Sequence, residues 1–297
     1  MGVSLRAGHE GEAGGIGREL GGSSAGWAVI LGASEGTGAA IVRAVAREPG
    51  LDIFGAHRGN HPEAAALLEQ DVIAAGRRVV LRVGDAGTAE GARLGAEALL
   101  EVAGPGSVRL FVHSLASASM GRLAAGSGPR VAPRQVEKTF DVMAHSFLYW
   151  AQALVERGLL APSARLIGLT NSLDDSLVGG LGLIAAAKGA LEAYVRTLAL
   201  ELGPLGHRVN LLKFPTVITP AVRKVYGEAA LDRIVATHLK MIPAGRMCTV
   251  EEVARFVTVL AGDAGEWFNG ATIDYSGGLT LGLADLLLGR GPEPGRS

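Results

Sequence analysis

The sequence is poor in several residue types that define other protein classes. The chain of 297 residues has one cysteine, 12 prolines and 5% aromatic residues, and its net charge is −1. The single thiol, Cys248, excludes an internal disulfide framework and a cysteine-rich site, and no metal is predicted. The balanced charge provides no basic surface for nucleic acid, and no apolar run approaches the roughly 18 residues of a membrane span. We therefore expect a globular, cytoplasmic protein without a nucleic-acid or membrane partner.

Glycine, in contrast, is abundant, and its distribution divides the chain. The 44 glycines are about twice the number that average usage would give. Nine of them fall within residues 1–26, which show mixed charges and no hydrophobic periodicity, so this segment is predicted to be a disordered extension. Residues 27–281 show no break in composition and are predicted to form one domain. A C-terminal tail over 282–297 is predicted to follow it.

Within this domain, short apolar runs alternate with longer stretches of helical character. Strands are predicted over 28–31, 52–56, 78–83, 108–113, 165–169, 208–213 and 271–274. Helices are predicted over 39–48, 63–75, 89–102, 135–156, 184–202 and 250–261. Alternation at this spacing is typical of βαβ units and of a parallel sheet covered by helices on both faces. The predicted fold class is therefore α/β, a doubly wound Rossmann-type parallel sheet in a single domain.

A glycine-rich segment follows the first predicted strand and precedes the first predicted helix. Its candidate binding residues are Gly32, Ser34, Glu35, Gly36, Thr37 and Gly38. Glycines at this spacing permit a tight turn that brings backbone N–H groups and a helix N-terminus against a pyrophosphate. The segment is predicted to bind a dinucleotide; a glycine-rich turn that binds nothing is the alternative.

The end of the second predicted strand bears on which dinucleotide this is. An NAD enzyme places an acidic side chain on the adenosine ribose about 20 residues after the glycines. Here the strand ends with His57 and Arg58, without a carboxylate. A cation suits the 2′-phosphate of NADP(H), although Glu35 in the glycine-rich segment argues mildly the other way. NADP(H) is therefore favoured over NAD(H), with Arg58 as a solvated surface residue being the alternative.

Further motifs follow in a set order along the chain. They are Asp85 after the third strand, Lys188 in the run 187–192, the segment 215–219 and the run 274–278. Together with the glycine-rich segment they make residues 27–278 resemble the short-chain dehydrogenase/reductase family. That resemblance implies that the cofactor is bound by further residues, namely Asp85, Ala86, His113, Ser114, Leu115, Lys188, Pro215, Ile218 and Thr219.

Two details are similar to the enoyl-[acyl-carrier-protein] reductase branch of that family. The fourth strand ends in His113, Ser114 and Leu115, which resembles the His-Ser-hydrophobic signature of that branch. Met143 stands where most of the family has a catalytic Asn, which enoyl reductases also lack. The glycine-rich segment, however, is of the general family type.

The catalytic tyrosine that the resemblance implies is missing. In the general family it precedes the lysine by four residues, which is Ile184 here, and in enoyl reductases by seven, which is Leu181. We expect these two side chains to line the substrate pocket. Of the four tyrosines, Tyr194 is turned about 240° from Lys188 on the same helix. Only Tyr226, in a segment that resembles a substrate-covering loop, is placed to swing into the site.

The remaining catalytic candidates are polar residues near the expected tyrosine. Lys188 is expected to fix the nicotinamide ribose, as the resemblance implies. Thr170, Asn171 and Ser172 end the fifth strand and can donate hydrogen bonds to a carbonyl oxygen. His113 lies where ligands meet such sheets, and a structural, hydrogen-bonded histidine is an equally good interpretation.

Three functional hypotheses remain open. The first is an NADP-dependent reductase of an enoyl or imine group in an acyl or polyketide-like substrate, which a carrier protein could present. The second is a non-redox enzyme, such as a cyclase, dehydratase or isomerase, on a repurposed fold. The third is a non-catalytic cofactor-binding partner. The resemblance further implies a homo-tetramer or homo-dimer that pairs through the helices predicted at 135–156 and 184–202.

Overall fold

The computed structural model describes residues 26–172, 179–220, 222–223, 227–281 and 288–289. The predicted N-terminal extension and C-terminal tail therefore lie almost wholly outside the described residues. Tyr226 also lies outside the described residues.

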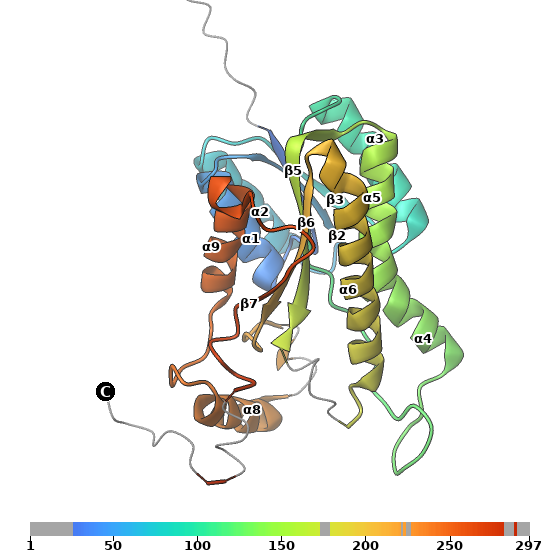
Figure 1. Cartoon of the computed structure of the whole chain (residues 1–297), viewed down its shortest axis with the longest axis vertical. Coiled ribbons are helices and arrows are strands. Elements are labelled where there is room, and N and C mark those ends of the chain that lie inside the picture. Colours follow the sequence, from blue (N-terminus) through green and yellow to red (C-terminus); the bar gives the residue numbers. More distant parts are fainter. Residues whose placement is uncertain (1–25, 173–178, 221, 224–226, 282–287, 290–297) are drawn as a thin grey trace, which may run out of the picture.

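The described part of the chain is built on one parallel sheet of seven strands in the order β3-β2-β1-β4-β5-β6-β7. The chain runs outward from β1 to β3 and then crosses back to β4 on the other side of β1 (Figure 1). This is the doubly wound arrangement predicted from the alternating apolar runs. The strands are β1 (Trp27–Leu31), β2 (Asp52–His57), β3 (Val79–Val83), β4 (Val108–His113), β5 (Leu160–Asn171), β6 (Arg208–Phe214) and β7 (Thr272–Asp274).

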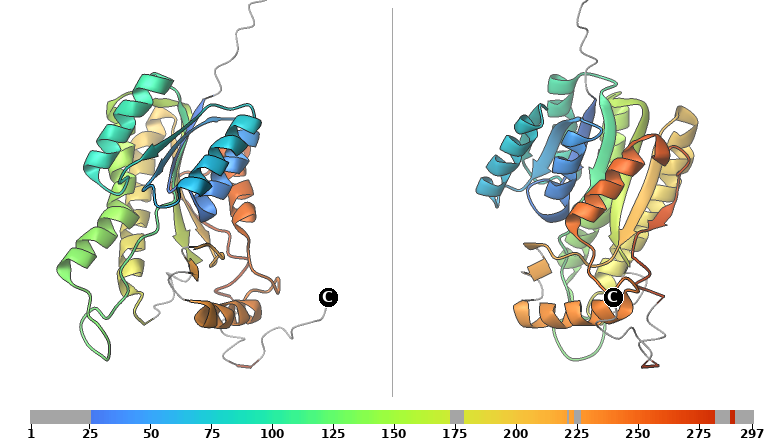
Figure 2. Two further views of the ribbon diagram at one scale, coloured as in Figure 1. Left: turned by 180° about the vertical axis from the view of Figure 1, so that it is seen from behind. Right: turned by 90° about the vertical axis from the view of Figure 1, so that its left-hand side faces the viewer.

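Helices cover both faces of the sheet and enclose two apolar cores. One core lies beneath α3 (Ala89–Ala103), α5 (Ser146–Glu156) and α6 (Gly182–Leu202). The other lies beneath α1 (Gly36–Arg47), α2 (Pro62–Ala74) and α9 (Val250–Ala261). The views from the side and from behind show these two helical layers with the sheet between them (Figure 2). Strands β1 and β4 are buried almost throughout because both of their faces are covered.

The remaining helices lie near the carboxyl ends of the strands. Helix α4 (Pro133–Phe140) continues into α5 through a π-helical turn at Asp141–His145, and α8 (Glu228–Met241) lies across the end of the molecule (Figure 1). Two short 3-10 turns, Gly203–Leu205 and Asp263–Gly265, complete the described elements. No described helix is both long and apolar enough to cross a bilayer.

Three predictions of individual elements need correction. The helix predicted over 135–156 is two α-helices joined by the π-turn, so its two halves are rotated relative to each other. Strand β5 is longer than predicted and begins at Leu160, although Pro162 and Ser163 interrupt its apolar pattern. The segment 220–241, which resembles a substrate-covering loop, contains helix α8, which was not predicted.

Candidate functional site

A cavity of about 480 Å³ opens at the carboxyl ends of β1, β2, β3 and β4. This is where the strand order reverses, and ligands bind open α/β sheets at that point. The predicted cofactor residues that line the cavity are Gly32, Ser34, Glu35, Gly36, Thr37, His57, Arg58, Asp85, Ala86, Ser114, Leu115 and Thr219. Residues far apart in the sequence are thus brought to one site because parallel strands end at the same edge of the sheet.

The glycine-rich turn has the close approach and the backbone geometry that its sequence indicated. Gly32 and Gly36 have φ angles of +76° and +54°, which residues other than glycine rarely adopt. Gly38 does not line the cavity, but a Cβ there would collide with the carbonyl oxygen of Gly32. The three glycines therefore bring the start of α1 against the turn. Because the Glu35 side chain does not cap α1, the first N–H groups of this helix are open to an anion.

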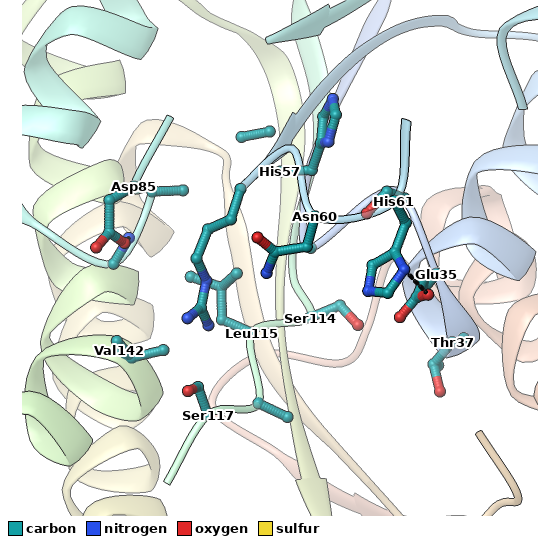
Figure 3. Close-up of a pocket in the computed structure, with 18 of the residues that line it drawn as sticks. Glu35, Thr37, His57, Asn60, His61, Asp85, Ser114, Leu115, Ser117 and Val142 are labelled. Atoms are coloured by element: carbon teal, nitrogen blue, oxygen red, sulfur yellow. Dashed lines mark hydrogen bonds and ion pairs between the residues drawn. The ribbon is translucent and has the colours of Figure 1, made fainter. Parts of the chain in front are cut away.

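The segment after β2 adds polar and basic groups to one side of the cavity. His57, Asn60 and His61 lie together there with Glu35, while Asp85 lies on the opposite side (Figure 3). Burial lowers the pKa of His57 below its ordinary value. Nδ1 of His61 lies 2.9 Å from Oε1 of Glu35, so the acid of the turn has a partner.

These residues fit a dinucleotide. The open helix N-terminus suits a pyrophosphate. The Asp85 carboxylate, which accepts a hydrogen bond of 3.0 Å from Gly87 N–H, lines the cavity from the segment after β3. Within the described ranges, no three His, Cys, Asp or Glu side chains lie close enough together to hold a metal ion.

Several lining residues were not predicted. They are Ala56, Asn60, His61, Gly84, Gly87, Ala116, Ser117, Ala118, Val142 and Pro220. Most of them directly follow β2, β3 or β4, so their position just after a predicted strand could have identified them as lining residues. Val142 is different, because it comes from the π-turn between α4 and α5.

Lys188 and the end of β5 form a buried polar group beyond the glycine-rich turn. The Lys188 ammonium donates a hydrogen bond of 2.7 Å to the carbonyl oxygen of Leu169. Thr170 is buried, and the Asn171 amide donates to the Thr216 hydroxyl at 3.5 Å. Ser172 is fully buried, and its hydroxyl has no partner among the described residues. Pro215 and Ile218 lie in this part of the chain and do not line the cavity.

His113 is placed in the core rather than on the cavity surface. Its ring is fully buried, packs edge-on against Phe147, and lies with Nε2 2.7 Å from Oγ of Ser146. Desolvation, together with the positive charge of Lys188, lowers the pKa of His113 to about 3. The ring is therefore neutral near pH 7, and its placement favours the structural interpretation over a direct role in binding or catalysis.

The described tyrosines are engaged away from the candidate site. The hydroxyl of Tyr149 donates to Asp141 at 3.4 Å, and the hydroxyl of Tyr194 lies 3.0 Å from Nδ1 of His145. Tyr275 stacks on Phe256 with ring centroids 4.6 Å apart. At the positions where the resemblance leads one to expect a tyrosine, Leu181 precedes α6 and Ile184 lies in its first turn; both are partly exposed.

Comparison with known proteins identifies the family of the chain. Residues 32–280, most of the chain, match the family model described as enoyl-(acyl carrier protein) reductase. The chain belongs to this family. It is thus of the short-chain dehydrogenase/reductase type.

Three proteins to which the chain is similar differ in how much of it they match. Dehydrogenase OXI1 of Cochliobolus heterostrophus is 37% identical over 127 residues, which are 41% of this chain and 53% of that protein, so the chain spans about half of its length. The 1-cyclohexenylcarbonyl-CoA reductase of Streptomyces collinus is 24% identical to this chain. The matched region covers 85% of this chain and 86% of that protein. The structure of a blue fluorescent protein from a metagenomic library, in complex with NADPH, superposes with a TM-score of 0.73 at 26% identity, covering 86% of this chain and 97% of that one.

Proposed function

We propose that this protein is an NADP(H)-dependent reductase of an enoyl, or imine, group in an acyl or polyketide-like substrate. The observation that carries the proposal is the cavity at the strand ends, which combines an open helix N-terminus with the basic side chain of Arg58. A guanidinium is well suited to a phosphate monoester such as the 2′-phosphate. The NADPH in the related metagenomic protein and the acyl-CoA named for the Streptomyces relative support the proposal.

The side chains at the end of β5 are suited to the chemistry of an activated alkene. A bound NADPH would supply hydride to the β-carbon of an α,β-unsaturated thioester. The product of that addition is an enolate, which water can protonate later, whereas an alkoxide formed from a ketone needs its proton almost at once. The enolate oxygen requires hydrogen-bond donors, and the buried Ser172 hydroxyl and the Asn171 amide are candidates. Lys188 is proposed to hold the nicotinamide ribose.

The apolar residues Leu181 and Ile184 are consistent with this choice of reaction. Neither can donate a proton, so the site lacks at these positions the acid that alcohol dehydrogenases of the family require. The membership of the chain in an oxidoreductase family favours a reductase over a non-redox enzyme or a non-catalytic partner.

Two partners are proposed with the activity. We propose that coenzyme A or a carrier protein presents the thioester, and that the exposed Arg122 and Arg130 bind its phosphate groups. Both arginines lie on a loop that contacts the segment before α6, where Gly121 N–H donates a hydrogen bond of 3.1 Å to the Gly180 carbonyl oxygen. A homo-dimer or homo-tetramer is proposed to form through α5 and α6, where Val155 and Leu200 are exposed. Mass photometry of the purified chain tests the oligomer; a monomer would contradict it.

Titration followed by turnover tests the proposed activity. Purified protein is first titrated with NADPH and NADH by nucleotide fluorescence, and binding of neither would refute the proposal. Oxidation of NADPH is then followed with crotonyl-CoA and with a simple ketone. We expect turnover of the thioester and none of the ketone. A Lys188→Met variant that retains full activity and affinity would contradict the ribose-binding role.

A further inference from the structure

The ion pair between Glu35 and His61 joins the starts of two neighbouring helices. Glu35 is the N-cap residue of α1 and His61 is the N-cap residue of α2. A polar side chain at this position ordinarily accepts a hydrogen bond from the backbone of its own helix. Neither side chain does so here, and instead they meet each other at 2.9 Å on the wall of the cavity (Figure 3).

The position of Glu35 creates a problem for a site that binds phosphates. Its carboxylate lies in the glycine-rich turn and lines the same cavity as Arg58. A carboxylate favours the open N–H groups and positive end of a helix, which is where a pyrophosphate would bind. Left alone, Glu35 would compete with that phosphate and would repel a further phosphate on the adenosine ribose.

The His61 side chain counters both effects. It holds the carboxylate toward the start of α2, away from the first turn of α1, and supplies an N–H donor to Glu35. Pro62 at the first position of α2 starts that helix without help from a side-chain cap, so His61 is not required for capping.

We propose that His61 is a positioning residue that holds the Glu35 carboxylate away from the phosphate site and thereby permits the 2′-phosphate of NADP(H) to bind. This inference rests on the dinucleotide binding proposed above. It assigns cofactor selectivity to a pair of residues rather than to Arg58 alone. Because His61 acts through Glu35, its contribution disappears when the negative charge of Glu35 is removed.

A double-mutant cycle measures this coupling. Dissociation constants for NADPH and NADH are determined for the wild-type protein, His61→Ala, Glu35→Gln and the double variant. Both side chains are partly exposed, so His61→Ala is expected to weaken NADPH binding by about three- to tenfold relative to NADH. Glu35→Gln is expected to retain or improve NADPH binding. In the Glu35→Gln background, His61→Ala is expected to change the NADPH-to-NADH ratio less than twofold.

A matched control comes from a second ion pair between the same two helices. Arg43 of α1 and Asp71 of α2 pair at 2.6 Å outside the cavity, and Asp71→Asn is expected to leave both dissociation constants unchanged. An unchanged NADPH-to-NADH ratio in His61→Ala would overturn the inference, and so would an equal loss in the presence of Glu35→Gln. Failure of wild-type protein to bind either nucleotide would instead overturn the proposed function.

Discussion

Replacing Gly38 by alanine tests whether the turn before α1 must approach the helix as closely as the structure shows. A Cβ at Gly38 would lie 2.9 Å from the carbonyl carbon of Gly32 and closer still to its oxygen, inside the 3.0 Å that real Cβ contacts keep. The colliding atoms belong to the backbone, so no side-chain rotation can relieve the overlap. The turn and the helix must separate, which removes the geometry that a pyrophosphate needs.

The size of this effect follows from the cost of overpacking. Backbone shifts forced by an added methyl group cost about 1–3 kcal/mol, and alanine in a helix returns at most about 1 kcal/mol relative to glycine. A net loss of about 1–2 kcal/mol lowers the melting temperature of a domain of this size by roughly 2–8 °C. We also expect the dissociation constant for NADPH to rise by about tenfold or more, since a displaced α1 no longer directs its N–H groups at the phosphates.

Thermal unfolding and fluorescence titration provide the assay, and a second glycine provides the control. Gly262 follows α9, and a Cβ there would make only ordinary contacts of 3.7 Å. Gly262→Ala is therefore expected to leave binding unchanged and to stabilise the protein by about 0.4–1 kcal/mol. If Gly38→Ala matched Gly262→Ala in both measurements, the close approach would be unimportant and the argument for this turn as a phosphate site would fail.

Three further predictions concern buried polar groups. Ser172→Ala should leave the free energy of unfolding unchanged or raise it by up to about 1 kcal/mol, since the hydroxyl has no described partner. Its turnover of crotonyl-CoA should fall by about tenfold or more. Turnover equal to that of the wild type would exclude Ser172 from the mechanism. Trp150→Phe should cost about 1–3 kcal/mol in urea unfolding, because the carbonyl oxygen of Ala86 loses the indole N–H that donates to it at 3.0 Å. His113 takes up a proton near pH 6.5 when unfolded but only near pH 3 when folded. The stabilising contribution of His113 is therefore complete above pH 6.5, and it is lost as the pH falls, by up to about 1.4 kcal/mol per pH unit. The free energy of unfolding of the wild type minus that of His113→Asn should thus decrease from pH 7 to pH 5. A constant difference would contradict this.

Much of the fold could be predicted because its signals are local. Buried parallel strands are continuous apolar runs, and Val108–His113 was predicted to the residue for that reason. The same logic missed the first part of β5, where Pro162 and Ser163 break the apolar pattern, although register with β4 extends the strand to Leu160. The π-turn at Asp141–His145 depends on how two helix halves pack, which no local pattern indicates.

The site likewise has features that the local sequence predicts and features that depend on packing. The glycine spacing predicted the turn before α1 because φ angles and close approach are properties of single residues. The partner of Glu35 could not be predicted, since His61 reaches it only through the packing of α1 beside α2. His113 was expected at the site because it ends a strand, but Ser146 and Phe147 of the neighbouring helix cover it.

The π-turn sets the angular phase of α4. Such a turn holds one residue more than an α-helical turn, and one residue corresponds to roughly 100° of rotation. Because of that rotation, Thr139 of α4 accepts a hydrogen bond of 3.3 Å from Ser119 N–H, next to the cavity wall at Ser117, while Val142 in the turn itself faces the cavity. Deleting one residue from Asp141–His145 would restore a continuous helix and turn Thr139 away from Ser119. One inserted residue in a helix therefore rotates the preceding helix relative to the loop at the cavity wall, and family members with and without it should differ in cavity shape even where their lining residues are identical.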